Sequence, residues 1–69
     1  MFAYNYQITS LIEKRIGYVK DARANGLGND KYFADMEKLI RGGLDRLKEQ
    51  STSKKLIAKY QKLVDECFL

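Results

Sequence analysis

The stretch NDKYFADMEKLIRGGLDRLKE, residues 29–49, decides the fold because it is the clearest amphipathic helix in the chain. At 100° per residue, its apolar residues and one glycine fall within a sector of about 140°. These residues are Tyr32, Phe33, Met36, Leu39, Ile40, Gly43, Leu44 and Leu47. On the polar side, Glu37 precedes Arg41 in the favourable i, i+4 order. So wide a stripe needs apolar partners on neighbouring segments.

A glycine pair, Gly42-Gly43, interrupts this helix and costs it about 1 kcal/mol per glycine relative to alanine. One interpretation is a kink or break after Arg41. The other is the close approach of another helix at Gly43, which lies inside the apolar stripe. The ion-pair spacing favours a continuous helix, so we expect a mild kink at most.

A helix over residues 5–25 is predicted to precede this segment. Its apolar residues are Ile8, Leu11, Ile12, Ile16, Tyr18, Val19 and Ala22. Gly26 can take the left-handed conformation that ends a helix, and we expect Leu27 to cover the end of the core. Asn29 or Asp30 can cap the next helix. So short a connection makes the two helices antiparallel neighbours.

A third helix is predicted over residues 53–68, after hydroxyl side chains that can cap it. Its apolar sector holds Leu56, Ile57, Tyr60, Leu63, Val64, Cys67 and Phe68. Asp65 and Glu66 lie in the last turn, where the helix dipole disfavours them, so this end should fray or find a partner. Three such helices, about 5–25, 29–49 and 53–68, predict an all-α antiparallel three-helix bundle in a single domain, residues 1–69.

Residues 2–9 fit two structures. Phe2, Tyr4, Tyr6 and Ile8 alternate with smaller or polar residues, as in a half-buried strand, and Ser10 could then cap the following helix. Alternatively, the helix already begins near Tyr4. We favour the helix, because a lone strand has no partner within the chain.

The composition limits the chemistry of the chain. Among its 69 residues are one cysteine and no histidine, so an internal disulfide is impossible and a zinc site is not expected. A domain of this size buries only about 60% of its surface, and self-association is the stabilising device that remains. We therefore expect a homo-oligomer that is not an enzyme and has no cofactor. Cys67 is expected to be a packed thiol with a raised pKa.

The net charge is +4, with 13 basic and nine acidic side chains. Such a charge can attract nucleic acid, anionic membranes or acidic protein surfaces, yet it is ordinary for a small domain. The longest uncharged run, residues 1–12, is too short and too polar for a membrane span. A cytoplasmic protein without a membrane partner is the expectation.

The candidate partner interface consists of Phe2, Tyr4, Tyr6 and Arg15. Aromatic rings are enriched at the centres of protein contacts, although these three could instead close one end of the bundle. Arg15 lies within the apolar sector of its helix. Its stem can pack while its head reaches water, or it can pair with a group on another chain.

Three lysines, Lys55, Lys59 and Lys62, share one ridge of the third helix. A charged ridge of this kind is most often a solvated face. The alternative is a set of contacts to phosphate groups or to an acidic surface, which needs several such contacts at once.

These features favour a small helical regulator or inhibitor that acts by protein–protein interaction with an unidentified partner. The second hypothesis is a dimeric DNA-binding repressor. If residues 2–9 form a strand, the order strand, helix, helix resembles that of ribbon-helix-helix proteins, whose paired strands enter the major groove. That resemblance implies that Asn5, Gln7 and Thr9 face the bases, since asparagine and glutamine suit adenine. The strand has no Arg or Lys, and nucleic acid ranks below a protein partner.

Overall fold

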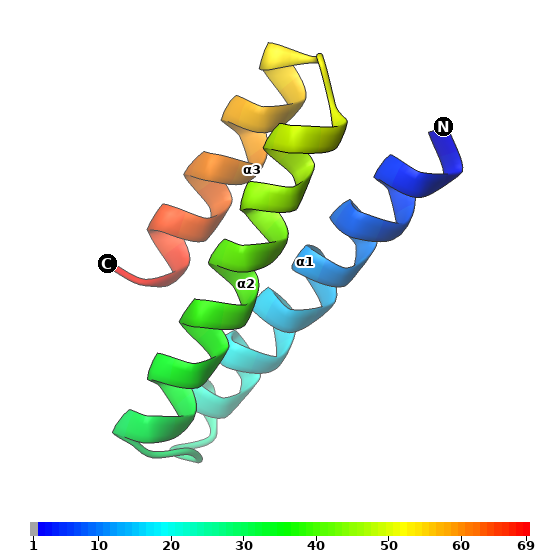
Figure 1. The fold of residues 1–69 in the computed structure, drawn as a ribbon. Helices are drawn as coiled ribbons and strands as arrows, with labels where there is room; N and C mark the ends of the chain where they lie inside the picture. The colour runs from blue at the N-terminus through cyan, green and yellow to red at the C-terminus, as the bar shows by residue number, and fades with distance from the viewer. Residues whose placement is uncertain (1) are drawn as a thin grey trace.

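The computed structural model describes the backbone of residues 2–69 and the side chains of residues 6–69. Three helices follow one another along the chain, α1 (Phe2–Ala24), α2 (Asp30–Gln50) and α3 (Lys54–Cys67). They run up, down and up in one elongated bundle of 37 × 21 × 17 Å (Figure 1). The predicted all-α three-helix bundle is confirmed, and each predicted helix end lies within three residues of the observed one. The predicted self-association stays a prediction.

The first helix includes residues 2–9, so the strand alternative for this segment is wrong. Ser10 lies in the helix interior with an exposed side chain and does not act as an N-cap. In this helix Thr9 and Ile12 are buried in the interior of the bundle. The side chains of Phe2 and Tyr4 lie outside the described residues.

Two backbone motifs fix the antiparallel arrangement of α1 and α2. At the end of α1, Gly26 has φ +65°, the Leu27 N–H donates to the Ala22 carbonyl at 2.8 Å and the Gly26 N–H donates to Arg23. This pattern is a Schellman motif, and it needs a residue that tolerates positive φ. At the start of α2, the Asn29 side chain accepts from the Tyr32 N–H at 2.8 Å, as an N-cap should.

The buried core lies between the three helices and consists of aliphatic side chains, one tyrosine and one thiol. Its members are Ile12, Ile16, Val19, Ile40, Leu44, Leu47, Tyr60, Val64 and Cys67. Each helix supplies three of them, which confirms the predicted apolar stripes at their centres. The margins of those stripes behave differently, and the candidate site is built there.

The glycine pair in α2 is explained by close packing. The helix is continuous from Asp30 to Gln50, so there is no break after Arg41. A Cβ atom added at Gly43 would lie 3.3 Å from Ile12 Cγ1, whereas one added at Gly42 would meet nothing within 4 Å. Gly43 thus allows α1 to approach α2 closely, and Gly42 leaves its side of the helix bare.

Polar contacts fasten α3 to the other two helices. Arg41 donates to Glu37 at 2.8 Å and to Asp65 at 3.1 Å, so Asp65 in the last turn of α3 has found its partner within the chain. The Tyr60 hydroxyl donates to Glu13 at 2.9 Å and links α3 to α1. Arg23 donates to the Cys67 carbonyl and satisfies a group at the C-terminus of α3.

Candidate interaction surface

The pair formed by α1 and α2 has a second face, which α3 does not cover. Large apolar side chains stand in the open there: Leu11 on α1 is 45% exposed, Tyr18 on α1 is 51% exposed and Leu39 on α2 is 50% exposed. Single exposed apolar side chains are ordinary on a protein surface, but a contiguous set is typical of a contact site. We call this surface, made of residues from α1 and α2 only, the uncovered face.

Helical spacing shows that these side chains belong to one surface. On α1, Leu11, Arg15 and Tyr18 follow one another at intervals of four and three residues. On α2, Leu39, Gly42 and Arg46 follow at intervals of three and four. Residues three and four apart share one side of a helix, and this alternation is the spacing with which helices pack side by side in bundles.

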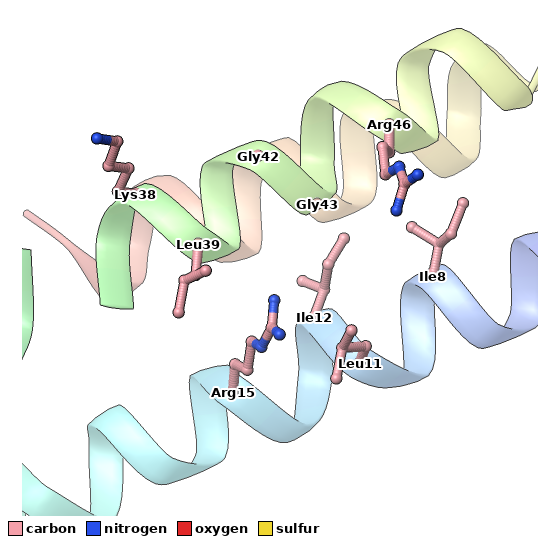
Figure 2. Close-up of a pocket in the computed structure, with 9 residues that line it drawn as sticks. All are labelled: Ile8, Leu11, Ile12, Arg15, Lys38, Leu39, Gly42, Gly43 and Arg46. Carbon is pink, nitrogen blue, oxygen red and sulfur yellow. The ribbon is translucent and has the colours of Figure 1, made fainter. Parts of the chain in front are cut away.

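A groove of about 330 Å³ runs between the two helices on this face. Its lining consists of Ile8, Leu11, Ile12, Arg15, Lys38, Leu39, Gly42, Gly43 and Arg46. Figure 2 shows Ile12 between the two helices, opposite Gly43, with Leu11 and Leu39 on the two sides. The missing side chains at Gly42 and Gly43 hollow the wall formed by α2.

The charges of the groove lining are all positive. Arg15, Lys38 and Arg46 line it, and no carboxylate does. In Figure 2, Arg15 extends from α1 toward Leu39 and Arg46 extends from α2 toward Ile8, while Lys38 reaches outward at the rim. Among the side chains that the structure describes, the guanidinium groups of Arg15 and Arg46 have no ion pair and no place over an aromatic ring.

A second cavity of about 420 Å³ lies near the α1–α2 turn. It shares no lining residue with the groove and forms a separate section of the uncovered face. Tyr18, Ala22, Leu27 and Tyr32 supply its apolar walls, and Asp21 is its one charged residue. Leu27 is 63% exposed, so the expectation that it covers the end of the core is wrong. The Schellman turn holds Leu27 outward instead, where it extends the apolar surface beyond the groove.

Of the predicted interface residues, Arg15 lies on the uncovered face and is partly buried. Tyr6 is 72% exposed, which is inconsistent with a ring that closes the core. At 100° per residue, the nine positions between Tyr6 and Arg15 place them on opposite sides of α1, so the two do not form one site. The predicted roles of Phe2 and Tyr4 concern side chains outside the described residues.

The lysine ridge of α3 is exposed at Lys55, Lys59 and Lys62. Lys59 Nζ lies 5.5 Å from the centre of the Tyr60 ring, and α3 contributes no residue to the groove or to the second cavity. The ridge and the groove are therefore separate surfaces. Contacts of these lysines with phosphate or with an acidic surface stay a prediction.

The one thiol is a core group. Cys67 is buried, and burial raises its pKa, an effect that Arg23 and Lys20 partly offset. A protonated, inaccessible thiol is a poor nucleophile, and the prediction of a packed cysteine is confirmed. Within residues 6–69, no cluster of acidic or cysteine side chains is arranged to hold a metal ion.

Sequence reasoning missed the open wall of the groove on α2. It placed Leu39 in the apolar stripe and assigned no role of its own to Gly42. The available signal was position, because Leu39 lies at one margin of the 140° sector, with Arg46 and Gly42 just beyond it. A stripe too wide for its neighbours to cover leaves its margin exposed.

Comparison with protein-family models, with curated proteins and with solved structures found no match for this chain. In the described residues, none of the helices has the length and hydropathy to cross a membrane.

Proposed function

We propose that this protein is a small helical regulator or inhibitor that works by binding another protein through the uncovered face of α1 and α2. The observation that carries the proposal is the groove itself, an apolar trough with Leu11 and Leu39 on its sides and Arg15 and Arg46 reaching in from opposite walls. Contact sites combine such apolar centres with arginine anchors.

Within the described chain, the fold does not require this surface to be apolar. Leu39 is half exposed although three apolar residues of the same helix are fully buried. Exposed apolar area costs about 25 cal/mol per Å² relative to burial. A partner that covers the groove removes this cost, and the gain in free energy drives binding.

The DNA-binding alternative is not favoured by any feature of the fold. Its reading strand would be residues 2–9, and these belong to α1. Duplex binding through the lysine ridge of α3 remains a separate prediction with its own test, binding of random-sequence duplex DNA across a salt series. Several phosphate contacts would show as an affinity that falls steeply with salt.

The proposal is tested by photo-crosslinking in the cells that make the protein. A photoreactive phenylalanine analogue at position 39 should give a discrete crosslinked product with one other protein. The matched control places the same analogue at position 62 on the exposed side of α3, where no product is expected. Both sites are exposed, so the fold tolerates the analogue at either.

Two results would contradict the proposal. One is the absence of any product at position 39 at full expression. The other is the same set of products at positions 39 and 62, which would show unspecific contact with the surroundings. A crosslinked product of twice the mass of the chain would identify the partner as a second copy of this protein instead of a foreign protein.

A further inference from the structure

We infer that the groove receives one amphipathic helix of a partner protein, whose apolar stripe is flanked by two carboxylates seven residues apart. This inference rests on the proposed function and specifies its partner. It follows from three properties of the uncovered face: its helical spacing, its bare α2 wall and the placement of its two arginines.

The spacing fixes the kind of secondary structure that fits. Both walls present residues at alternating intervals of three and four, Leu11, Arg15 and Tyr18 on one side and Leu39, Gly42 and Arg46 on the other. A helix laid between them can place its own side chains into both rows, as a fourth helix does in a bundle.

The bare wall fixes how closely the helix approaches. A Cβ atom at Gly42 would meet nothing within 4 Å, so no atom of this chain fills the space beside α2 at that position. Small residues at a helix surface let a second backbone come near. An apolar side chain of the partner therefore has room to pack against the half-exposed Leu39 beside Gly42.

The arginines indicate the charge of the partner helix and the spacing between its charged residues. Arg15 reaches toward Leu39, and Arg46 follows Leu39 by two helical turns on α2 (Figure 2). Two turns are about 10 Å along the helix axis. Carboxylates seven residues apart on one side of a partner helix have the same separation, so each can form a charge-assisted pair with one guanidinium.

The charge of the uncovered face changes sign between the groove and the cavity near the α1–α2 turn. The section near the turn is lined by Asp21 and two tyrosines and has no cation. The carboxylates of the partner must therefore lie on the half that meets Arg15 and Arg46, and its other half should be neutral or basic. The cavity lined by the two tyrosines adds apolar contact area and does not require a charged residue on the partner.

A second copy of the chain suits this groove less well. Paired through the same face, two copies would bring two sets of Arg15, Lys38 and Arg46 together, and like charges placed opposite each other oppose association. The lysine ridge of α3 is also basic. The charge of the groove calls for an acidic helix, which a foreign protein can supply.

Selection from a display library of random 18-residue peptides, with the intact protein as bait, tests the inference. Enriched peptides should be amphipathic and should carry acidic residues seven apart beside apolar ones. A selected peptide should lose about tenfold or more in affinity for the Arg46→Glu variant in fluorescence anisotropy, because a favourable charge pair becomes a repulsive one. Lys54→Glu makes the same charge change at an exposed position of α3 outside the lysine ridge and should alter the affinity less than about twofold.

Charge exchange sharpens the test. Replacing one carboxylate of the selected peptide with lysine should restore binding to Arg46→Glu, which a general loss of structure would not allow. A Cβ atom at Gly42 meets nothing within 4 Å, so Gly42→Phe should place its ring in the groove and abolish binding while the circular dichroism spectrum keeps its helical form. Enrichment of neutral or basic peptides, or equal losses for Arg46→Glu and Lys54→Glu, would overturn the inference.

The two proposals fail in different ways. A crosslinked partner at position 39 whose contact segment is not an acidic helix leaves the proposed function standing and removes this inference. A dimer in sedimentation velocity that Gly42→Phe dissociates identifies the occupant as a second copy and also removes it. Absence of both crosslinked and selected partners removes the proposed function itself.

Discussion

The two faces of the α1–α2 pair are built from the same helices but differ in the burial and the pairing of their side chains. On the side that α3 covers, Ile16, Leu44 and Leu47 are buried, and the charged group that enters from α2, Arg41, has two carboxylate partners. On the uncovered face, Leu39 is half exposed and Arg46 has no ion pair among the described residues. The groups of the first face find their partners within the chain, and the second is the face for which we propose a binding partner.

This contrast assigns different roles to residues that are alike in sequence. Leu39 and Leu47 belong to one apolar stripe, yet Leu47 is buried and Leu39 lines the open groove. Gly42 and Gly43 both line the groove, yet only Gly43 lies against a side chain of α1. Paired substitutions therefore measure the difference between the faces directly.

The largest difference is expected between Leu47→Ala and Leu39→Ala. Leu47 is fully buried, and truncation of such a leucine costs about 2–5 kcal/mol of the free energy of unfolding. Leu39→Ala removes a side chain that is already half in water and should cost less than about 1 kcal/mol. Urea unfolding followed by circular dichroism measures both, and equal losses would show that the uncovered face is part of the core.

High pH should lower the free energy of unfolding through two ionisable groups on the covered side. Burial raises the pKa of Tyr60, and the hydrogen bond to Glu13 adds to this effect. Burial also raises the pKa of Cys67 above its ordinary value of 9.0. The folded state then holds more protons than the unfolded state once the pH exceeds the unfolded pKa values, so the free energy of unfolding falls as pH rises through that range.

The expected slope is at most about 1.4 kcal/mol per pH unit for each group. Urea titrations at pH 8, 9.5 and 10.5 measure it. The double variant Tyr60→Phe, Cys67→Ala lacks both ionisable groups and serves as the control. If its free energy of unfolding falls with pH as steeply as that of the unmodified protein, the two buried groups are not the cause.

The two glycines of α2 should differ in how much stability each gains on replacement by alanine. Gly42→Ala gains helix propensity in open space and should stabilise the fold by about 1 kcal/mol. Gly43→Ala gains the same propensity, but its Cβ would lie 3.3 Å from Ile12 Cγ1, so Ile12 must shift and the gain is reduced or lost. Thermal melts of the two variants, made in parallel, measure the difference. Equal gains would mean that α1 does not press on α2 at Gly43.

The smallest effect on stability is expected on the uncovered face. Leu11→Lys replaces an exposed apolar side chain with a charged one and should change the free energy of unfolding by less than about 0.5 kcal/mol. The same variant should weaken binding of a selected peptide, since it removes an apolar wall of the groove. A variant that unfolds would place Leu11 in the core.

Sequence patterns predict the covered side well because that side follows from local rules. The centre of each apolar stripe is buried, the Asn29 and Ser53 caps form as their residue types suggest, and the spacing of Glu37 and Arg41 yields the ion pair. Helical periodicity and capping act within one or two turns. A single sequence carries that information fully.

The candidate site is harder to predict because it depends on what is left uncovered. Periodicity shows that Arg15 lies in an apolar sector, but it cannot show whether a neighbouring helix covers that residue. The partner of Asp65, Arg41 on α2, likewise depends on how α3 packs, 24 residues away in sequence. Such contacts depend on how the helices are placed relative to one another. The pattern within a single helix does not carry that information.

Arg23 has a consequence for the order in which the chain assembles. Its guanidinium lies 5.4 Å from the centre of the Phe33 ring and 5.7 Å from that of Phe68, and it donates to the Cys67 carbonyl, so it joins the ends of all three helices. The link to Cys67 spans 44 residues, far more than the local contacts of the α1–α2 hairpin. Loop-closure entropy grows with that separation, and contacts of long range follow local ones in folding. We therefore expect the contact between Arg23 and Cys67 to form after the local contacts within the α1–α2 and α2–α3 pairs, as the step that closes the bundle.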